Sequence, residues 1–95
     1  FFVQKGGLRI ELLHYASPGA FGTPASRRNQ RGLTHLSFVV DDVDAAAADL
    51  VRFGGTIIPG PRNGLHDPET VQTIFLADPD GTRVELMRLA KGQKW

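Results

Sequence analysis

The chain contains the stretch Gly81-Thr82-Arg83-Val84-Glu85-Leu86-Met87, and a closely similar stretch, Gly7-Leu8-Arg9-Ile10-Glu11-Leu12-Leu13, lies near its start. The two copies begin 74 residues apart. Glycine, arginine, a β-branched residue, glutamate, leucine and a long apolar residue recur in the same order. In both copies charged residues alternate with apolar ones, as they do along a half-buried β-strand. A strand pattern repeated in this way indicates a duplicated structural unit.

Each copy places a glutamate, Glu11 or Glu85, in the middle of the predicted strand. Alternation puts Arg83 and Glu85 on one face of the second copy and Val84 on the other. A carboxylate flanked by apolar residues is costly to bury unless something pairs with it. The repeated glutamate therefore indicates either a site for a cation or a proton, or an outward-facing Glu beside Arg in a surface ladder.

The length and composition exclude several classes of protein. A chain of 95 residues forms one domain at most, with a modest core. The formal net charge of +1 argues against a nucleic-acid-binding surface, and the absence of cysteine excludes disulfides and thiolate metal sites. No apolar run reaches the roughly 18 residues that a membrane helix needs, and no signal peptide is evident. We expect a cytoplasmic protein with no membrane partner.

The first third of the chain is predicted to be a hairpin followed by a linker. Residues 1–15 alternate on both sides of a Lys-Gly-Gly turn and are expected to form the last strand or strands of a first module. Residues 16–32 are rich in Ser, Pro, Gly and Asn and have no apolar period, which is typical of an inter-module linker. The linker carries Arg27, Arg28 and Arg31, which are either solvated or positioned to bind an anionic substrate.

Residues 33–88 are predicted to form an α+β unit with the order strand, helix, strand, strand, strand. The acidic run 41–44 caps a helix that Gly54 and Gly55 terminate. Helical spacing places one apolar stripe toward the sheet, made of Val43, Ala46, Ala47, Leu50 and Phe53. The four strands are expected at 33–40, 56–59, 70–77 and 82–88, and residues 89–95 form a tail.

Three residues, Glu11, His35 and Glu85, are candidates for a shared site. Each is predicted in mid-strand, on the face opposite the residues that pack against the helix. Imidazole and carboxylate groups on adjacent strands can converge on one divalent ion such as Zn, Fe, Ni, Co or Mn. The alternative for His35 alone is a satisfied histidine at the rim of the core. His14 has the opposite strand parity, and His66 lies in a predicted loop.

Two stretches of the chain resemble a known superfamily. The run from Gly32 through Thr34-His35-Leu36 to Val40-Asp41-Asp42-Val43 is similar to the opening of the second module in the vicinal oxygen chelate superfamily. The run 75–86, which reads Phe-Leu-Ala-Asp-Pro-Asp-Gly-Thr-Arg-Val-Glu-Leu, is similar to its closing motif. The superfamily includes glyoxalase I, methylmalonyl-CoA epimerase, extradiol dioxygenases and the fosfomycin and bleomycin resistance proteins. The resemblance implies paired βαβββ modules that form an open cup around one divalent metal ion.

The resemblance also implies roles for individual residues. His35 matches the histidine on the first strand of the second module, and Glu85 matches the glutamate on its last strand. Glu11 matches the corresponding glutamate of the first module, which in glyoxalase I is both a metal ligand and a proton-transfer group. The ligand on the first strand of module one has no counterpart in residues 1–95. We expect either residues before Phe1 or a second copy of the chain in a homodimer to supply it.

The function implied by the resemblance is that of a metal-dependent lyase or isomerase. Such an enzyme stabilises an enediolate of a small hydroxycarbonyl or thiol-adduct substrate, with Glu11 or Glu85 moving the proton. An extradiol-type dioxygenase is one alternative, but it requires a second histidine ligand for Fe(II). The other alternative is a metal-free cup that binds a drug or metabolite, as bleomycin resistance proteins do.

Overall fold

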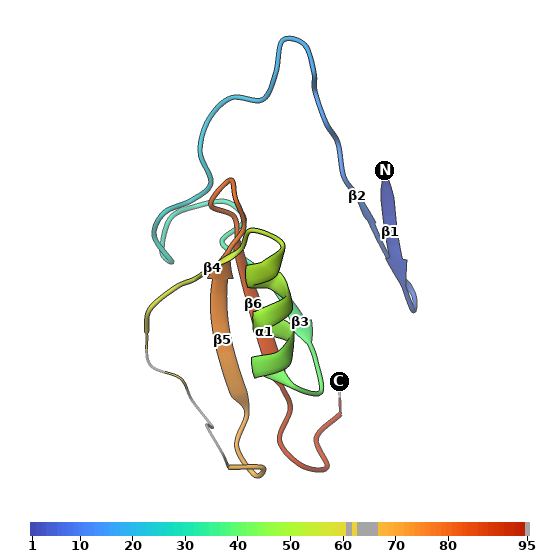
Figure 1. The fold of residues 1–95 in the computed structure, drawn as a ribbon, viewed down its shortest axis with the longest axis vertical. Helices are drawn as coiled ribbons and strands as arrows, with labels where there is room; N and C mark the ends of the chain where they lie inside the picture. Colours follow the sequence, from blue (N-terminus) through green and yellow to red (C-terminus); the bar gives the residue numbers. More distant parts are fainter. Residues whose placement is uncertain (61, 63–66, 95) are drawn as a thin grey trace.

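The part of the chain that the structure describes forms two separate sheets and one helix (Figure 1). The computed structural model describes residues 1–60, 62 and 67–94. Its elements are β1 (Phe2–Lys5), β2 (Leu8–Glu11), β3 (Leu36–Val39), α1 (Val43–Arg52), β4 (Thr56–Ile57), β5 (Gln72–Ala77) and β6 (Arg83–Arg88). The strands β1 and β2 form a hairpin, and the other four form a larger sheet that carries α1 on one face. The predicted α+β class and the βαβββ order of the larger unit are confirmed.

The larger sheet has the strand order β3-β6-β5-β4. β3 runs parallel to β6, so the first and last strands of the unit are neighbours, and the other pairs are antiparallel. In this register Ser37 of β3 lies opposite Glu85 of β6, which in turn lies opposite Phe75 of β5. These three residues form one row across the sheet.

The helix α1 begins and ends where its local sequence signals lie. The side chain of Asp42 accepts a hydrogen bond from the backbone N–H of Ala45 at 2.9 Å, which satisfies one free donor of the first turn. Phe53 is the C-terminal cap, and Gly54 follows it with a φ of +99°, a conformation that glycine adopts without strain. The prediction that Phe53 faces the sheet is wrong. Its side chain is 82% exposed because it lies past the last helical residue.

The core lies between α1 and one face of the larger sheet. It consists of Val43, Ala47, Ile74, Leu76 and Leu86, all buried. Val84 and the helical residues Ala46 and Leu50 pack around this cluster. Because alternate residues of β5 and β6 point to the helix, the intervening residues, Glu85 among them, belong to the opposite face. We call this opposite face of the larger sheet the cup face.

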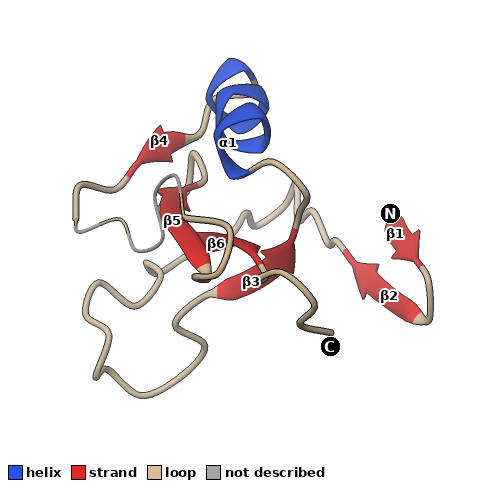
Figure 2. Ribbon diagram, turned by 90° about the horizontal axis from the view of Figure 1, so that it is seen from below, coloured by secondary structure: helices blue, strands red, loops and turns tan. Residues whose placement is uncertain are grey.

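The hairpin stands apart from the larger sheet. β1 and β2 pair antiparallel, and the backbone N–H of Leu12 extends the ladder by donating to the carbonyl of Phe1 at 2.7 Å. Within the described residues, neither hairpin strand packs against α1 or against a strand of the larger sheet (Figure 2). Its large apolar side chains are therefore exposed, including Phe1, Phe2, Val3, Leu8 and Leu12.

Several strands are shorter than the sequence pattern predicts. β2 ends at Glu11 although the pattern continues to Tyr15, and β4 ends at Ile57 although it continues to Pro59. β3 begins at Leu36, so the prediction that His35 lies in mid-strand is wrong: His35 immediately precedes the strand. An apolar alternation shows where a strand can form, but the length of the neighbouring strand decides where its ladder of hydrogen bonds stops.

The segment 16–32 has neither helix nor strand, as predicted, yet it contacts the larger sheet. The guanidinium of Arg83 donates a hydrogen bond to the backbone carbonyl of Ser26. The guanidinium of Arg28 lies over the ring of Phe75. The segment therefore crosses one end of the cup face. No helix in the described part of the chain has the length and apolarity of a membrane span.

Candidate functional site

The candidate site is built around His35 and Glu85 on the cup face. The parallel pairing of β3 with β6 places Ser37 directly opposite Glu85, and His35 precedes Ser37 by two residues. Residues two apart in an extended chain point to the same side. The Nε2 atom of His35 consequently lies 3.6 Å from Oε2 of Glu85. Two residues that are 50 positions apart in the chain are thus brought together by the parallel pairing of two strands.

Glu85 is a buried carboxylate with specific partners. Only 9% of the residue is exposed. The hydroxyl of Ser37 donates a short hydrogen bond to Oε2 of Glu85, the same oxygen that faces His35. A buried carboxylate without partners would be strongly destabilising, so the Ser37 hydroxyl and the His35 ring are what make this position tolerable. These contacts also hold the carboxylate toward the cavity.

The imidazole of His35 is held on two sides. Its Nδ1 atom lies 3.0 Å from the hydroxyl oxygen of Thr34, within hydrogen-bonding distance. The ring also packs edge-on against Phe75, with centroids 5.3 Å apart and planes at 76°. With Nδ1 engaged by Thr34, the Nε2 atom is the ring nitrogen that faces Glu85. An imidazole oriented through one nitrogen presents the other to a proton or a metal ion.

A cavity of about 230 Å³ opens beside this pair. Its lining is Arg28, Thr34, His35, Phe75, Arg83 and Glu85. Phe75 forms an apolar surface in this cavity. Its ring makes an edge-type contact with the His35 ring, and the Arg28 guanidinium lies 5.5 Å from its centroid. A concave site in which polar groups converge beside an aromatic surface is a usual form of a small-molecule site.

A second, larger cavity of about 510 Å³ lies on the helix side of the sheet. Apolar residues of β3, α1 and β6 form most of its lining, including Phe38, Val39, Ala46, Leu50 and Leu86. Its described lining contains no histidine, and its charged members are Asp49 of α1 and Lys5 at the end of β1. We regard it as an incompletely covered part of the core and place the chemistry at the smaller cavity.

Glu11 does not join His35 and Glu85 within the chain. It lies at the exposed end of β2, in the hairpin that stands apart from the sheet. In residues 1–60, 62 and 67–94, no group of three or more His, Asp or Glu side chains is close enough to share one ion. The structure therefore brings together two of the three predicted ligands.

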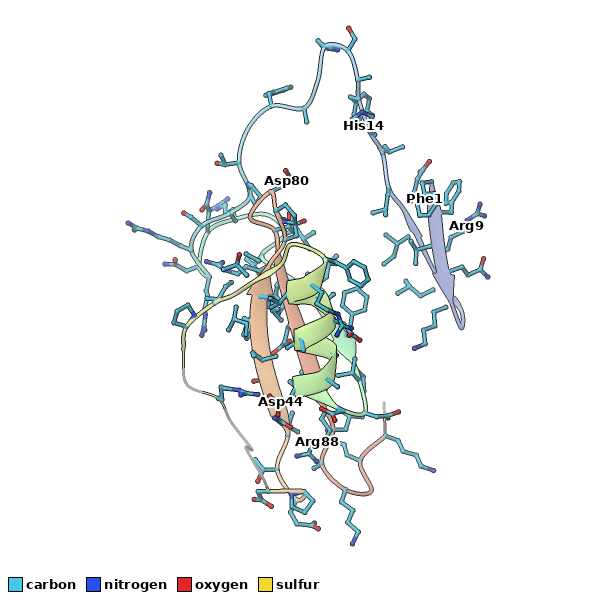
Figure 3. The ribbon with its side chains drawn as sticks, in the orientation of Figure 1. Phe1, Arg9, His14, Asp44, Asp80 and Arg88 are labelled. Atoms are coloured by element: carbon cyan, nitrogen blue, oxygen red, sulfur yellow. The ribbon has the colours of Figure 1, made fainter. Side chains whose placement is uncertain are left out.

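The remaining histidines and linker arginines divide in a similar way. His14 is exposed on the segment that follows β2, far from the larger sheet (Figure 3). His66 lies outside the described residues. All three linker arginines are exposed, and Arg28 is the one that lines the cavity.

The donor atoms of His35 and Glu85 fit a divalent ion. Imidazole nitrogen and carboxylate oxygen both bind such ions at about 2.0–2.1 Å, which puts two ligands of one tetrahedral ion roughly 3.4 Å apart. The observed separation of 3.6 Å between Nε2 and Oε2 is close to that value. Metal ligands are commonly oriented by hydrogen bonds from neighbouring residues, and Thr34 and Ser37 supply such bonds to His35 and Glu85.

Sequence reasoning did not name as site residues three members of the cavity wall, Thr34, Phe75 and Arg83, nor Ser37, which bonds to Glu85. Ser37 shares the strand parity of His35, and Arg83 shares that of Glu85, so alternation alone was enough to place both on the cup face. Thr34 precedes the strand, and its contact with His35 depends on local backbone geometry. Phe75 could not be placed there from the sequence, because only the register of β5 against β6 puts it beside Glu85.

Comparison with known proteins agrees with this fold. The family model described as the Glyoxalase/Bleomycin resistance protein/Dioxygenase superfamily matches residues 1–86. Searches of curated proteins and of solved structures returned no match. The family match spans both the hairpin with Glu11 and the larger unit with His35 and Glu85. The chain therefore belongs to the glyoxalase, bleomycin resistance protein and dioxygenase superfamily.

Proposed function

We propose that this chain is a divalent-metal-dependent lyase or isomerase that acts on a small hydroxycarbonyl or thiol-adduct substrate. The observation that carries the proposal is the 3.6 Å separation of His35 Nε2 and Glu85 Oε2 at the wall of a cavity. One neutral imidazole and one carboxylate, each held by a hydroxyl neighbour, form a donor pair that suits Zn, Ni, Co, Mn or Fe.

We propose that Glu11 of a second copy provides the third ligand. The repeated sequence makes Glu11 the counterpart of Glu85, yet its hairpin packs against no other element of its own chain within the described residues. The hairpin exposes Phe2 and Leu12, and the β3 edge of the larger sheet exposes Phe38 and Val39. Exchange of hairpins between two copies would cover both apolar surfaces and bring a carboxylate to each cup face.

The residues of the site then have separate tasks. A divalent ion held by His35 and Glu85 would supply Lewis acidity toward the substrate. Glu11 accepts and returns the proton next to the substrate carbonyl, because it is the carboxylate not already engaged by a hydroxyl. Glu85 is fixed in position by the Ser37 hydroxyl. Phe75 excludes water from one side of the cavity.

Metal content tests the proposal directly. We expect wild-type protein to retain one of Zn, Ni, Mn or Fe(II) and to be stabilised by it in thermal unfolding. His35→Ala and Glu85→Gln should abolish retention, because both remove a ligand. Glu11→Ala should reduce it less but stop turnover. Retention should fall as the solution is acidified, because imidazole binds metal only in its neutral form.

His14→Ala is the matched control, since it removes an exposed histidine outside the cavity and should retain metal like the wild type. Mixing Glu11→Ala with His35→Ala chains tests the exchange: mixed dimers should regain one complete site and part of the activity. If the wild type takes up no metal, or if His35→Ala retains as much, the cup is a metal-free binding protein instead. If the mixture of the two variants regains no activity, Glu11 of a second copy is not part of the metal site.

A further inference from the structure

Two arginines on the cup face are not used by the proposed metal chemistry. Arg83 lies on β6 two residues before Glu85, and Arg28 comes from the segment between the hairpin and β3. Both line the cavity that contains His35 and Glu85. None of the ion pairs formed among the described residues involves either of them.

Arg83 is anchored at one end and unpaired at the other. Its Nη2 atom donates to the backbone carbonyl of Ser26, which fixes the plane of the guanidinium. Its Nη1 atom is buried and has no hydrogen-bond partner among the residues that the structure describes. A buried N–H donor normally has an acceptor, and a guanidinium can only donate hydrogen bonds because it has no acceptor atom. The described residues therefore leave part of the hydrogen-bonding capacity of Arg83, a residue of the cavity wall, unused.

Arg28 lies where a second donor is needed. Its guanidinium lies over the ring of Phe75, 5.5 Å from the ring centroid. Stacking on an aromatic ring holds a guanidinium in place while leaving its N–H groups available at the edges. Phe75 is also the residue against which His35 packs. The Arg28 guanidinium and the His35 ring therefore both contact Phe75 in the wall of the cavity.

The charge of the lining favours a monoanion. Two guanidinium groups oppose the single carboxylate of Glu85, which leaves one positive charge when His35 is neutral. A carboxylate balances that charge, whereas a dianionic phosphate would exceed it. The volume of about 230 Å³ suits a small metabolite and is below the usual size of a drug-sized pocket.

We infer that the substrate carries a carboxylate, which the guanidinium groups of Arg83 and Arg28 bind while the reacting oxygens face His35 and Glu85. The location of the reacting end rests on the proposed function, but the anion subsite does not. The arginines determine which hydroxycarbonyl compounds enter: hydroxy or keto acids are accepted, and neutral analogues of the same shape are rejected. Arg28 and Arg83 are thus specificity-determining residues.

The test compares mandelate with mandelamide, which differ in charge but hardly in shape. Binding is measured calorimetrically on full-length protein freed of metal by a chelator, so that coordination contributes nothing. We expect mandelate to bind at least about tenfold more tightly, equivalent to about 1.4 kcal/mol. Arg28→Gln and Arg83→Gln should each remove most of this preference, and added salt should weaken it.

Arg27→Gln is the matched control, because it makes the same charge change one residue away from Arg28 and outside the cavity. Arg83→Lys keeps the positive charge but loses the planar set of N–H donors of the guanidinium. This variant should fold normally and still show little preference for mandelate over mandelamide. Equal binding of the two probes to wild type, no binding of either, or loss of preference in Arg27→Gln equal to that in Arg28→Gln would overturn the inference. If the protein prefers mandelate but takes up no metal in the retention assay, the anion subsite is supported and the proposed metal chemistry is contradicted.

Discussion

The strands β2 and β6 carry closely similar sequences, but the hairpin β1–β2 and the pair β5–β6 lie in very different surroundings. Leu76 is 1% exposed, whereas its repeat counterpart Phe2 is 51% exposed. Leu86 is 4% exposed, whereas Leu12 is 51% exposed. The difference is the presence of β3 and α1 beside β5–β6. A strand pattern specifies which face is apolar, and the neighbouring elements decide whether that face is buried.

The two pairs also differ in register by one residue. Glu85 lies opposite Phe75, so the matching position for Glu11 would be Phe1, but Glu11 lies opposite Phe2. A shift of one residue changes which faces of two strands meet. The connections explain it, because Gly6 and Gly7 form a two-residue turn, whereas five residues link β5 to β6.

The longer connection is held by an aspartate that the hairpin lacks. The side chain of Asp78 accepts hydrogen bonds from the backbone N–H groups of Asp80 at 2.9 Å and Thr82 at 2.8 Å. Gln4 occupies the equivalent position in the repeat. The hairpin therefore closes on its glycines with a different register, and the duplicated sequence does not produce a duplicated geometry within one chain.

The largest expected effect is on the buried member of the pair Leu76 and Phe2. Leu76→Ala should lower the free energy of unfolding by about 2–5 kcal/mol, because it leaves a cavity beneath α1. Phe2→Ala should change it by less than about 0.5 kcal/mol in the dissociated chain, since the side chain is half exposed. Denaturant unfolding of dilute protein measures both.

Phe2→Ala should instead weaken self-association, because the proposed exchange of hairpins buries this ring. Sedimentation of the variant and the wild type over a range of concentrations measures that effect. A wild type that stays monomeric at all accessible concentrations would contradict the exchange. A loss of unfolding free energy in Phe2→Ala as large as that in Leu76→Ala would show that the hairpin packs within its own chain.

The next effect concerns the turn that sets the register of β5 and β6. Asp78→Ala removes an acceptor of two backbone hydrogen bonds and should cost about 1–2 kcal/mol of unfolding free energy. Asp78→Asn is the matched control, because the amide oxygen can still accept both bonds. Thermal unfolding ranks the three proteins. An Asn variant as unstable as the Ala variant would point to the charge of Asp78, and the hydrogen bonds would then not be the cause.

The sequence predicts the helix and the faces of the larger sheet because those depend on local signals. Asp42 and Gly54 mark the helix ends, and alternation correctly assigns Val84 and Leu86 to the helix side. The adjacency of His35 and Glu85 depends on the parallel pairing of β3 with β6, which spacing alone does not specify. Here the resemblance to the superfamily supplied what periodicity could not.

What the sequence analysis got wrong in Phe53, and what it left open elsewhere, has physical causes that can be named. Phe53 was placed on the buried stripe by helical spacing, but the helix has ended before it. Glu11 has the right strand parity for the site, yet the position of a whole hairpin depends on what packs against it. Arg28 and Phe75 belong to the cavity through contacts between a loop and a strand, which no pattern in the sequence expresses.

The smallest expected effect is the local stability of the hairpin itself. The guanidinium of Arg9 lies 3.9 Å from the ring centroid of Phe2, and such a contact at an exposed site contributes about 0.5–1 kcal/mol. Arg9→Gln should therefore speed hydrogen exchange at the Leu12 amide, which bonds to the Phe1 carbonyl, by about two- to fivefold in the dissociated chain. The Val40 amide, which bonds to the Met87 carbonyl in the larger sheet, serves as the internal reference and should not change. Faster exchange at both amides would mean that the hairpin and the larger sheet open together. The two regions would then differ in burial but would not unfold independently.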